Sequence, residues 1–159
     1  MTDTVTDVTA TLPKGQKFKS QGRTITEGDL SLLTNLTWTT SELHSNAEYM
    51  KGTQFGNVIL AGPCVLACVI GLAGTSGFRQ ALHASGNRLV AMLGFEEVKF
   101  KAPVLPGDTL RAETEIVDAR ASSSNPRRGI LKIRDTCYKQ TGEMVSESIR
   151  NAMFERVGS

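Results

Sequence analysis

The strongest constraint on this chain is an apolar stretch from Val58 to Ala73, interrupted at Gly62, Pro63 and Gly71. It is too short for a membrane span, which needs about 20 apolar residues. Pro63 suits the first position of a helix, where its missing N–H has no intrahelical partner to lose. Because the helix that follows is apolar nearly all round, we expect it to be buried.

A series of strand-like segments follows this helix. In Leu110–Val117, apolar and polar residues alternate, as in a half-buried antiparallel strand. One further edge strand is expected before the helix, over residues 17–25. These elements predict an α+β fold, an antiparallel sheet wrapped around a long central helix. The five segments after the helix are Leu89–Leu93, Val98–Phe100, Leu110–Val117, Ile130–Tyr138 and Met144–Phe154.

The segment before the central helix carries helix signals. Thr26, with Asp29 three residues later, is close to a capping box, and Leu30, Leu33 and Leu36 have helical spacing. Residues 37–46 are predicted to form a polar loop with Trp38 and Leu43 pointing inward, and residues 47–52 one or two helical turns. We expect residues 1–15 to be a disordered tail and residues 16–159 to form one domain.

The composition narrows the class of function. The net charge is +2, from 18 basic and 16 acidic side chains that are mixed along the chain, so no nucleic-acid partner is indicated. The N-terminus has neither a basic start nor an apolar run, and we expect neither a secretory signal nor a membrane association. The three cysteines are an odd number, for which reduced thiols in a cytoplasmic protein are the simplest interpretation.

His44 lies in the polar loop, eighteen positions before Gly62 at the predicted helix start. Free N–H groups and the positive helix end there would stabilise an oxygen that gains negative charge. A thioester carbonyl gains such charge when water adds to its conjugated double bond, and a nearby histidine could transfer the proton. On spacing alone, a histidine at the surface or in a structural hydrogen bond is the simpler interpretation.

Several motifs in order along residues 16–156 resemble the MaoC-like hydratase family. This resemblance implies a hot-dog fold, a homodimer with sites near the subunit interface, and an acyl-CoA or carrier-protein thioester as substrate. No cofactor is implied beyond the coenzyme A that the substrate carries. The motifs are Arg23–Leu30, Leu43–Tyr49, Phe55–Gly62, Val98–Val104, Pro106–Leu110, Arg120–Gly129 and Gln140–Glu143.

The resemblance also implies roles for individual residues. His44 would be the acid–base residue, Gly62 would supply the oxyanion N–H, and Thr39 would hold water. The residues expected to bind substrate are Gly56, Asn57, Ala61 and Arg128.

The family's Asp–x–Asn–Pro–x–His loop is altered here, because Thr39 stands at the Asp position, Ser41 at the Asn position and Glu42 at the Pro position. A threonine does not accept a proton at neutral pH, so Glu42 is a candidate substitute carboxylate. The resemblance therefore leaves open a hydratase or dehydratase of a 2-enoyl-CoA and a catalytically silent acyl-thioester binder or partner subunit. A thioesterase is disfavoured, because residues 58–84 contain no acidic side chain.

Two other groups could carry chemistry. Cys64, Cys68 and His83 lie on one segment, but a metal site lacks a fourth ligand with suitable spacing, and core packing is the preferred interpretation. Lys99, Lys101, Arg127 and Arg128 could contact CoA phosphates or could simply be solvated. The Ser-x-x-Pro-x-Arg-Gly stretch that ends at Gly129 resembles the subgroup that handles short branched or dicarboxylic enoyl-CoA esters.

Overall fold

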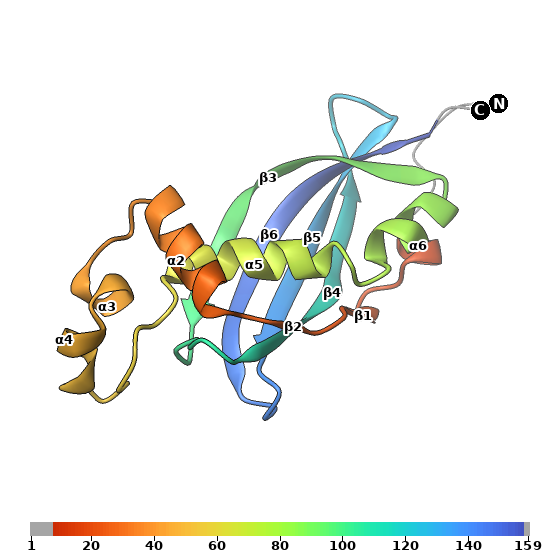
Figure 1. The fold of residues 1–159 in the computed structure, drawn as a ribbon. Coiled ribbons are helices and arrows are strands. Elements are labelled where there is room, and N and C mark those ends of the chain that lie inside the picture. Colours follow the sequence, from red (N-terminus) through yellow and green to blue (C-terminus); the bar gives the residue numbers. More distant parts are fainter. Residues whose placement is uncertain (1–7, 158–159) are drawn as a thin grey trace.

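Long antiparallel strands form one curved sheet in the order β1-β4-β5-β6-β3, with β2 pairing with β4. The computed structural model describes residues 8–157. Figure 1 shows the sheet curling round α5, which crosses its concave side. The strands are β1 (Lys17–Lys19), β2 (Arg23–Thr24), β3 (Asn87–Phe100), β4 (Thr109–Ala121), β5 (Arg128–Tyr138) and β6 (Met144–Arg156).

The outer strand β3 bends because its register against β6 shifts three times, between Leu89 and Ala91, Met92 and Gly94, and Phe95 and Glu97. Each extra residue increases the local bend and twist of a strand. The sequence pattern predicted two separate strands here, over 89–93 and 98–100. The structure corrects this to one continuous strand, whose bulges interrupt the alternation.

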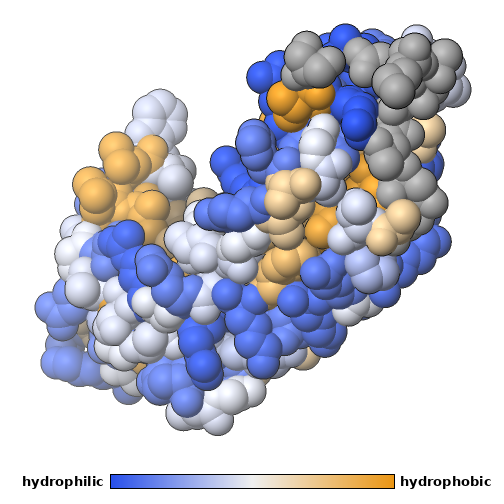
Figure 2. Space-filling view, turned by 90° about the vertical axis from the view of Figure 1, so that its right-hand side faces the viewer, coloured by the Kyte–Doolittle hydropathy of each residue, from blue (hydrophilic) through white to orange (hydrophobic). Residues whose placement is uncertain are grey.

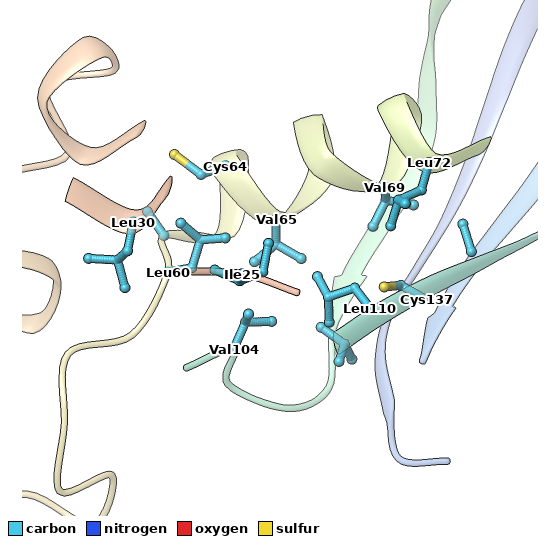
Figure 3. Packing of buried hydrophobic residues seen from close by; sticks show 13 residues of the cluster. Ile25, Leu30, Leu60, Cys64, Val65, Val69, Leu72, Val104, Leu110 and Cys137 are labelled. Carbon is cyan, nitrogen blue, oxygen red and sulfur yellow. The ribbon is translucent and has the colours of Figure 1, made fainter. Parts of the chain in front are cut away.

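The central helix α5 (Gly62–Ala73) packs on the sheet through one face. Val65, Val69 and Leu72 point toward Leu110 and Cys137 on the strands (Figure 3), and all are buried. The predicted burial of the helix holds for this face, whereas the opposite face is exposed in the single chain at Pro63, Ala67 and Gly71. As expected, the chain bends after the helix, and α6 (Phe78–Ala84) begins after Gly77, where φ is +83°.

A layer of polar residues divides the core into two apolar clusters. One cluster lies beneath α5, and the other is built around Phe78, Leu131 and Phe154. Between them, the fully buried Asp135 carboxylate accepts hydrogen bonds from Arg150 and, at 2.7 Å, from Thr114. The Arg150 side chain is 8% exposed, so a complete ion pair lies inside the sheet's concave face.

The segment before α5 projects from the sheet as three helices, α2 (Glu27–Leu36), α3 (Glu42–Ser45) and α4 (Ala47–Lys51) (Figure 1). The predicted capping box is confirmed, since Asp29 N–H donates to the Thr26 hydroxyl at 3.0 Å and Asp29 accepts from the Thr26 N–H at 2.9 Å. The pKa of the Asp29 carboxyl is lowered, mainly because the backbone N–H and the hydroxyl of Thr26 donate hydrogen bonds to its ionised form.

Three expectations about exposure and order need correction. Trp38 is 87% exposed and Leu43 is 38% exposed, so neither points inward. The expected tail begins to fold earlier than residue 16, because α1 (Val8–Thr11) is helical, and both Val8 and Leu12, which follows the helix, are buried. Residues 1–7 of that tail lie outside the described residues.

No single helix in residues 8–157 is long and apolar enough to span a membrane. Taken together, α5 and α6 have the length and apolar composition of a membrane span, but they are bent by 44° at their junction.

The buried ion pair generates a prediction about stability. Asp135→Ala leaves the Arg150 charge buried and unpaired, so we expect the free energy of unfolding to fall by about 3–5 kcal/mol. Urea unfolding followed by circular dichroism measures the change. Arg88→Ala, which breaks the exposed pair with Glu155, is the control and should cause a much smaller loss. Equal losses for the two variants would contradict this account.

Candidate active site

The start of α5 is held in place by the backbone just before it. Leu60 N–H donates to the Val104 carbonyl at 2.8 Å, and Ile59 N–H donates to the Leu43 carbonyl at 3.1 Å. Ala61, at the N-cap, is 1% exposed and offers no side-chain cap. The first turn therefore presents the N–H groups of Gly62 and Cys64, which have no acceptor within the helix.

His44 is joined to this same segment. Its Nδ1 donates to the Ile59 carbonyl at 2.7 Å, and because a carbonyl can only accept, the proton of a neutral His44 ring resides on Nδ1. Nε2 is then the nitrogen with a free lone pair, which is the arrangement that a general base requires. The hydrogen bond fixes both the ring orientation and the tautomer.

A cavity of about 450 Å³ brings His44 and Gly62 together. The predicted acid–base residue and the predicted oxyanion N–H thus face one space, although eighteen positions separate them in the chain. Phe55, Phe100 and Pro103 contribute apolar walls, and Lys101 adds a cation. A second cavity, of about 410 Å³, lies beside His44 and is the more polar of the two, so we call it the polar cavity; His44 is the residue that the two linings share.

Thr39 lines neither cavity, and its hydroxyl lies against the C-terminal end of α2. Its hydroxyl is 2.9 Å from the Thr37 hydroxyl, which in turn lies 3.4 Å from the Cys64 sulfur. Glu42 is exposed, and its carboxylate accepts from the Asn46 amide at 3.4 Å. Neither residue lines a cavity with His44, so the structure offers no loop carboxylate to it.

The residues expected to bind substrate are distributed differently. Asn57 lines the polar cavity. Gly56, in the turn just before Asn57, has a φ of +67° and lines neither cavity. Arg128 begins β5 at the far end of the sheet, where it pairs with Glu155 at 3.4 Å. Phe100, at the site, pairs with Ser146 on β6, and Ser146 pairs with Cys137 on β5. Arg128 is nine residues from Cys137 along β5, so at about 3.3 Å per residue it lies roughly 30 Å from the site. One chain does not bring Arg128 to His44.

The residues considered as metal ligands or as phosphate contacts lie apart from the site or from one another. Among residues 8–157, no group of three or more His, Cys, Asp or Glu side chains is placed to hold a metal ion. His83 is exposed on α6, and Lys99 pairs with Glu97. All three cysteines are free; burial raises the pKa of Cys68, and it raises the pKa of Cys137 to about 12.

Phe100 was not assigned a role from the sequence. A Cβ on Gly62 would lie 2.8 Å from its Cε2 atom, so the aromatic ring lies directly against the helix start. Phe100 and Lys101 fall within Val98–Val104, a stretch that carries the family resemblance, and this membership is the sequence signal that could have identified Phe100 as a site residue. Glu27, in the polar cavity, lies within Arg23–Leu30, which also carries the resemblance, but it was assigned no role; Thr34, in the same cavity, gave no signal in the sequence.

Residues 9–134 match the model of the MaoC like domain. This chain belongs to the MaoC-like domain family. A MaoC-like dehydratase from Rhodospirillum rubrum has the same fold, with a TM-score of 0.80 at 24% identity over 93% of this chain and 96% of that one. An Archaeoglobus structure described as a monoamine oxidase regulatory protein has a TM-score of 0.77 at 28% identity over 92% of both chains.

Curated relatives of this MaoC-like chain are hydratases and dehydratases. An (R)-specific enoyl-CoA hydratase from Rhodospirillum rubrum is 28% identical over 87% of this chain and 86% of its own length. A mesaconyl-CoA hydratase from Cereibacter sphaeroides is 37% identical over 42% of this chain, and a beta-methylmalyl-CoA dehydratase from Chloroflexus aurantiacus is 26% identical over 84%. The matches span 19% and 36% of those two longer proteins.

The contact between Gly62 and Phe100 can be tested through stability. Gly71→Ala places a methyl group where nothing lies within 4 Å, so we expect it to stabilise α5 by about 0.5–1 kcal/mol. Gly62→Ala should not give this gain, because the Phe100 ring must move. Adding Phe100→Ala should relieve the penalty, and a thermal-unfolding double-mutant cycle measures the coupling. Additive effects would show that the ring does not restrict Gly62.

Proposed function

We propose that this protein adds water to the double bond of a 2-enoyl-CoA and catalyses the reverse dehydration of the 3-hydroxyacyl-CoA. The observation that carries the proposal is the shared cavity of His44 and the α5 N-terminus. His44 has its Nδ1 hydrogen-bonded to Ile59 and its Nε2 available, and Gly62 offers an N–H at the positive end of α5. The hydratases and dehydratases among the relatives support the same chemistry.

In the proposed reaction, the water oxygen bonds to C3 of the substrate while one water proton passes to His44 Nε2. The electrons of the double bond move toward the thioester carbonyl, whose oxygen accepts a hydrogen bond from Gly62 N–H. A proton from His44 then bonds to C2, and the enolate returns to the carbonyl. The hydroxyl is on C3, one hydrogen is on C2, and no cofactor takes part beyond the substrate's own coenzyme A.

We propose a short branched or dicarboxylic acyl chain as substrate. Lys101 lines the cavity beside His44 and supplies a cation for a carboxylate or for a CoA phosphate. The mesaconyl-CoA and beta-methylmalyl-CoA enzymes among the relatives support dicarboxylic substrates. An absorbance assay over crotonyl-CoA, tiglyl-CoA and mesaconyl-CoA ranks these classes by kcat/KM.

We further propose that the protein acts as a homodimer joined through β3. This strand forms one edge of the sheet, and Val90, Met92 and Leu93 on it are 44–52% exposed. An exposed apolar edge strand favours pairing with another strand. Figure 2 shows a hollow in the molecular surface with apolar atoms on both sides. Sedimentation equilibrium tests this, with Met92→Lys as the interface variant; a wild-type monomer at micromolar concentration would contradict it.

A catalytically silent acyl-thioester binder is the second candidate. It is favoured by Thr39, whose hydroxyl bonds to Thr37 rather than facing His44. Binding of an enoyl-CoA by calorimetry, with no turnover of any thioester in the panel, would establish this alternative.

The role of His44 gives a direct test. His44→Ala should lower the kcat of hydration by roughly 100- to 10,000-fold, the usual contribution of a general acid–base group. His83→Ala is the matched control, because His83 is exposed on α6 and distant in sequence from the site. Absorbance of the enoyl thioester follows the reaction for both variants. Turnover of His44→Ala within a few-fold of wild type would exclude this role.

A further inference from the structure

The polar cavity beside His44 differs chemically from the cavity that contains Gly62. Six of its twelve lining residues carry hydroxyl or amide side chains, and the lining contains no lysine or arginine. Leu30, Val58 and Pro106 are the larger apolar members of the lining. The hydroxyl and amide residues are Ser31, Thr34, Asn35, Thr40, Ser45 and Asn57.

The side chains that line the polar cavity favour water over an acyl chain or a carboxylate as its occupant. An apolar acyl chain would leave the buried Thr34 hydroxyl without a hydrogen bond, and a substrate carboxylate would find no cation among the lining residues. Water satisfies donors and acceptors alike, and about 410 Å³ has room for several molecules at roughly 30 Å³ each. At the wall, Thr34 is 3% exposed, and its hydroxyl has no hydrogen-bond partner in residues 8–157. Buried hydroxyl groups of this kind are ordinarily satisfied, often by water.

Glu27 is the one carboxylate among the lining residues. It is an exposed residue in the first turn of α2, beside the capping box that fixes this helix. Of the other charged groups, Glu42 lies on the same helix α3 as His44 and accepts from Asn46, and Lys101 lines the adjoining cavity. Glu27 is therefore the acidic group that shares a water-accessible space with His44.

We propose that this polar cavity is the water chamber of the site, and that Glu27 orients its water for His44 in place of the absent loop carboxylate. The proposal rests on the hydratase function above. Water in the chamber donates one hydrogen bond to Glu27 and passes its other proton to His44 Nε2 as its oxygen bonds to C3. Glu27 stays ionised throughout, and the proton that bonds to C2 comes from His44. Glu27 is thus a positioning residue and does not bond to the substrate.

The test begins with Glu27→Gln, which removes the charge and keeps the shape. We expect kcat to fall by about 10- to 100-fold, as on loss of an outer-shell partner, with KM within twofold of wild type. Glu27→Asp should recover part of the rate. Glu48→Gln is the control, because Glu48 is exposed on α4 and pairs with Lys51 outside the chamber; it should leave kcat unchanged.

Thr34 supplies a second, independent variant. Thr34→Val keeps the volume and removes a buried hydroxyl without a partner, so the melting temperature should stay equal or rise. If that hydroxyl binds chamber water, kcat should nevertheless fall about 10-fold, and Thr34→Ser should restore it. A melting temperature and a rate that move in opposite directions separate this role from simple packing.

The outcomes distinguish this proposal from the proposed function. If His44→Ala is inactive while Glu27→Gln and Thr34→Val both keep kcat within threefold of wild type, the chamber proposal is overturned and the hydratase function stands. If wild type turns over no thioester, the hydratase function fails, and the chamber is judged by a high-resolution crystal structure. Ordered waters bonded to Thr34 Oγ1 and Glu27 support the chamber; a dry or ligand-filled cavity overturns it.

Discussion

The geometry of the site depends on the short segment Ile59–Gly62, which several separate parts of the chain hold at once. The Ile59 carbonyl accepts from His44, the Ile59 N–H bonds back to Leu43, and Leu60 bonds to Val104 in the β3–β4 connection. Since these are mostly backbone interactions, they constrain position without demanding particular side chains. The same contacts that begin α5 therefore set the distance between the histidine and the helix end.

The sequence predicted the main elements because their signals are local. Thr26 and Asp29 form the expected cap, and alternation in Leu110–Val117 identified a strand with one buried face. Predictions failed where tertiary context decides. The three bulges of β3 interrupted the alternation, and the exposed face of α5 could not be inferred from a helix that is apolar on every side.

The site was predictable in part for the same reason. His44 and Gly62 were identified by a resemblance carried in contiguous motifs, and the structure places both against one cavity. The orientation of Thr39 toward Thr37 depends on the path of an irregular loop, and the meeting of Glu27 with the space beside His44 depends on how α2 packs. Neither follows from spacing, because the residues lie on elements whose mutual placement the local pattern does not encode.

The ion pair within the concave face also has a bearing on strand register. Sliding β5 by one residue against β6 would turn its apolar residues outward, and the alternating pattern excludes that. Sliding by two residues preserves the alternation, so apolar burial alone discriminates poorly against it. Asp135 lies opposite Ser148 in the native register, one pair away from Arg150 on the same face. A two-residue shift that brings Asp135 opposite Ser146 would separate it from Arg150 and leave two charges unpaired in the core, at a cost of several kcal/mol. The opposite shift would place Asp135 directly across from Arg150. A single polar pair thus disfavours one of the two shifted alignments that hydrophobicity tolerates.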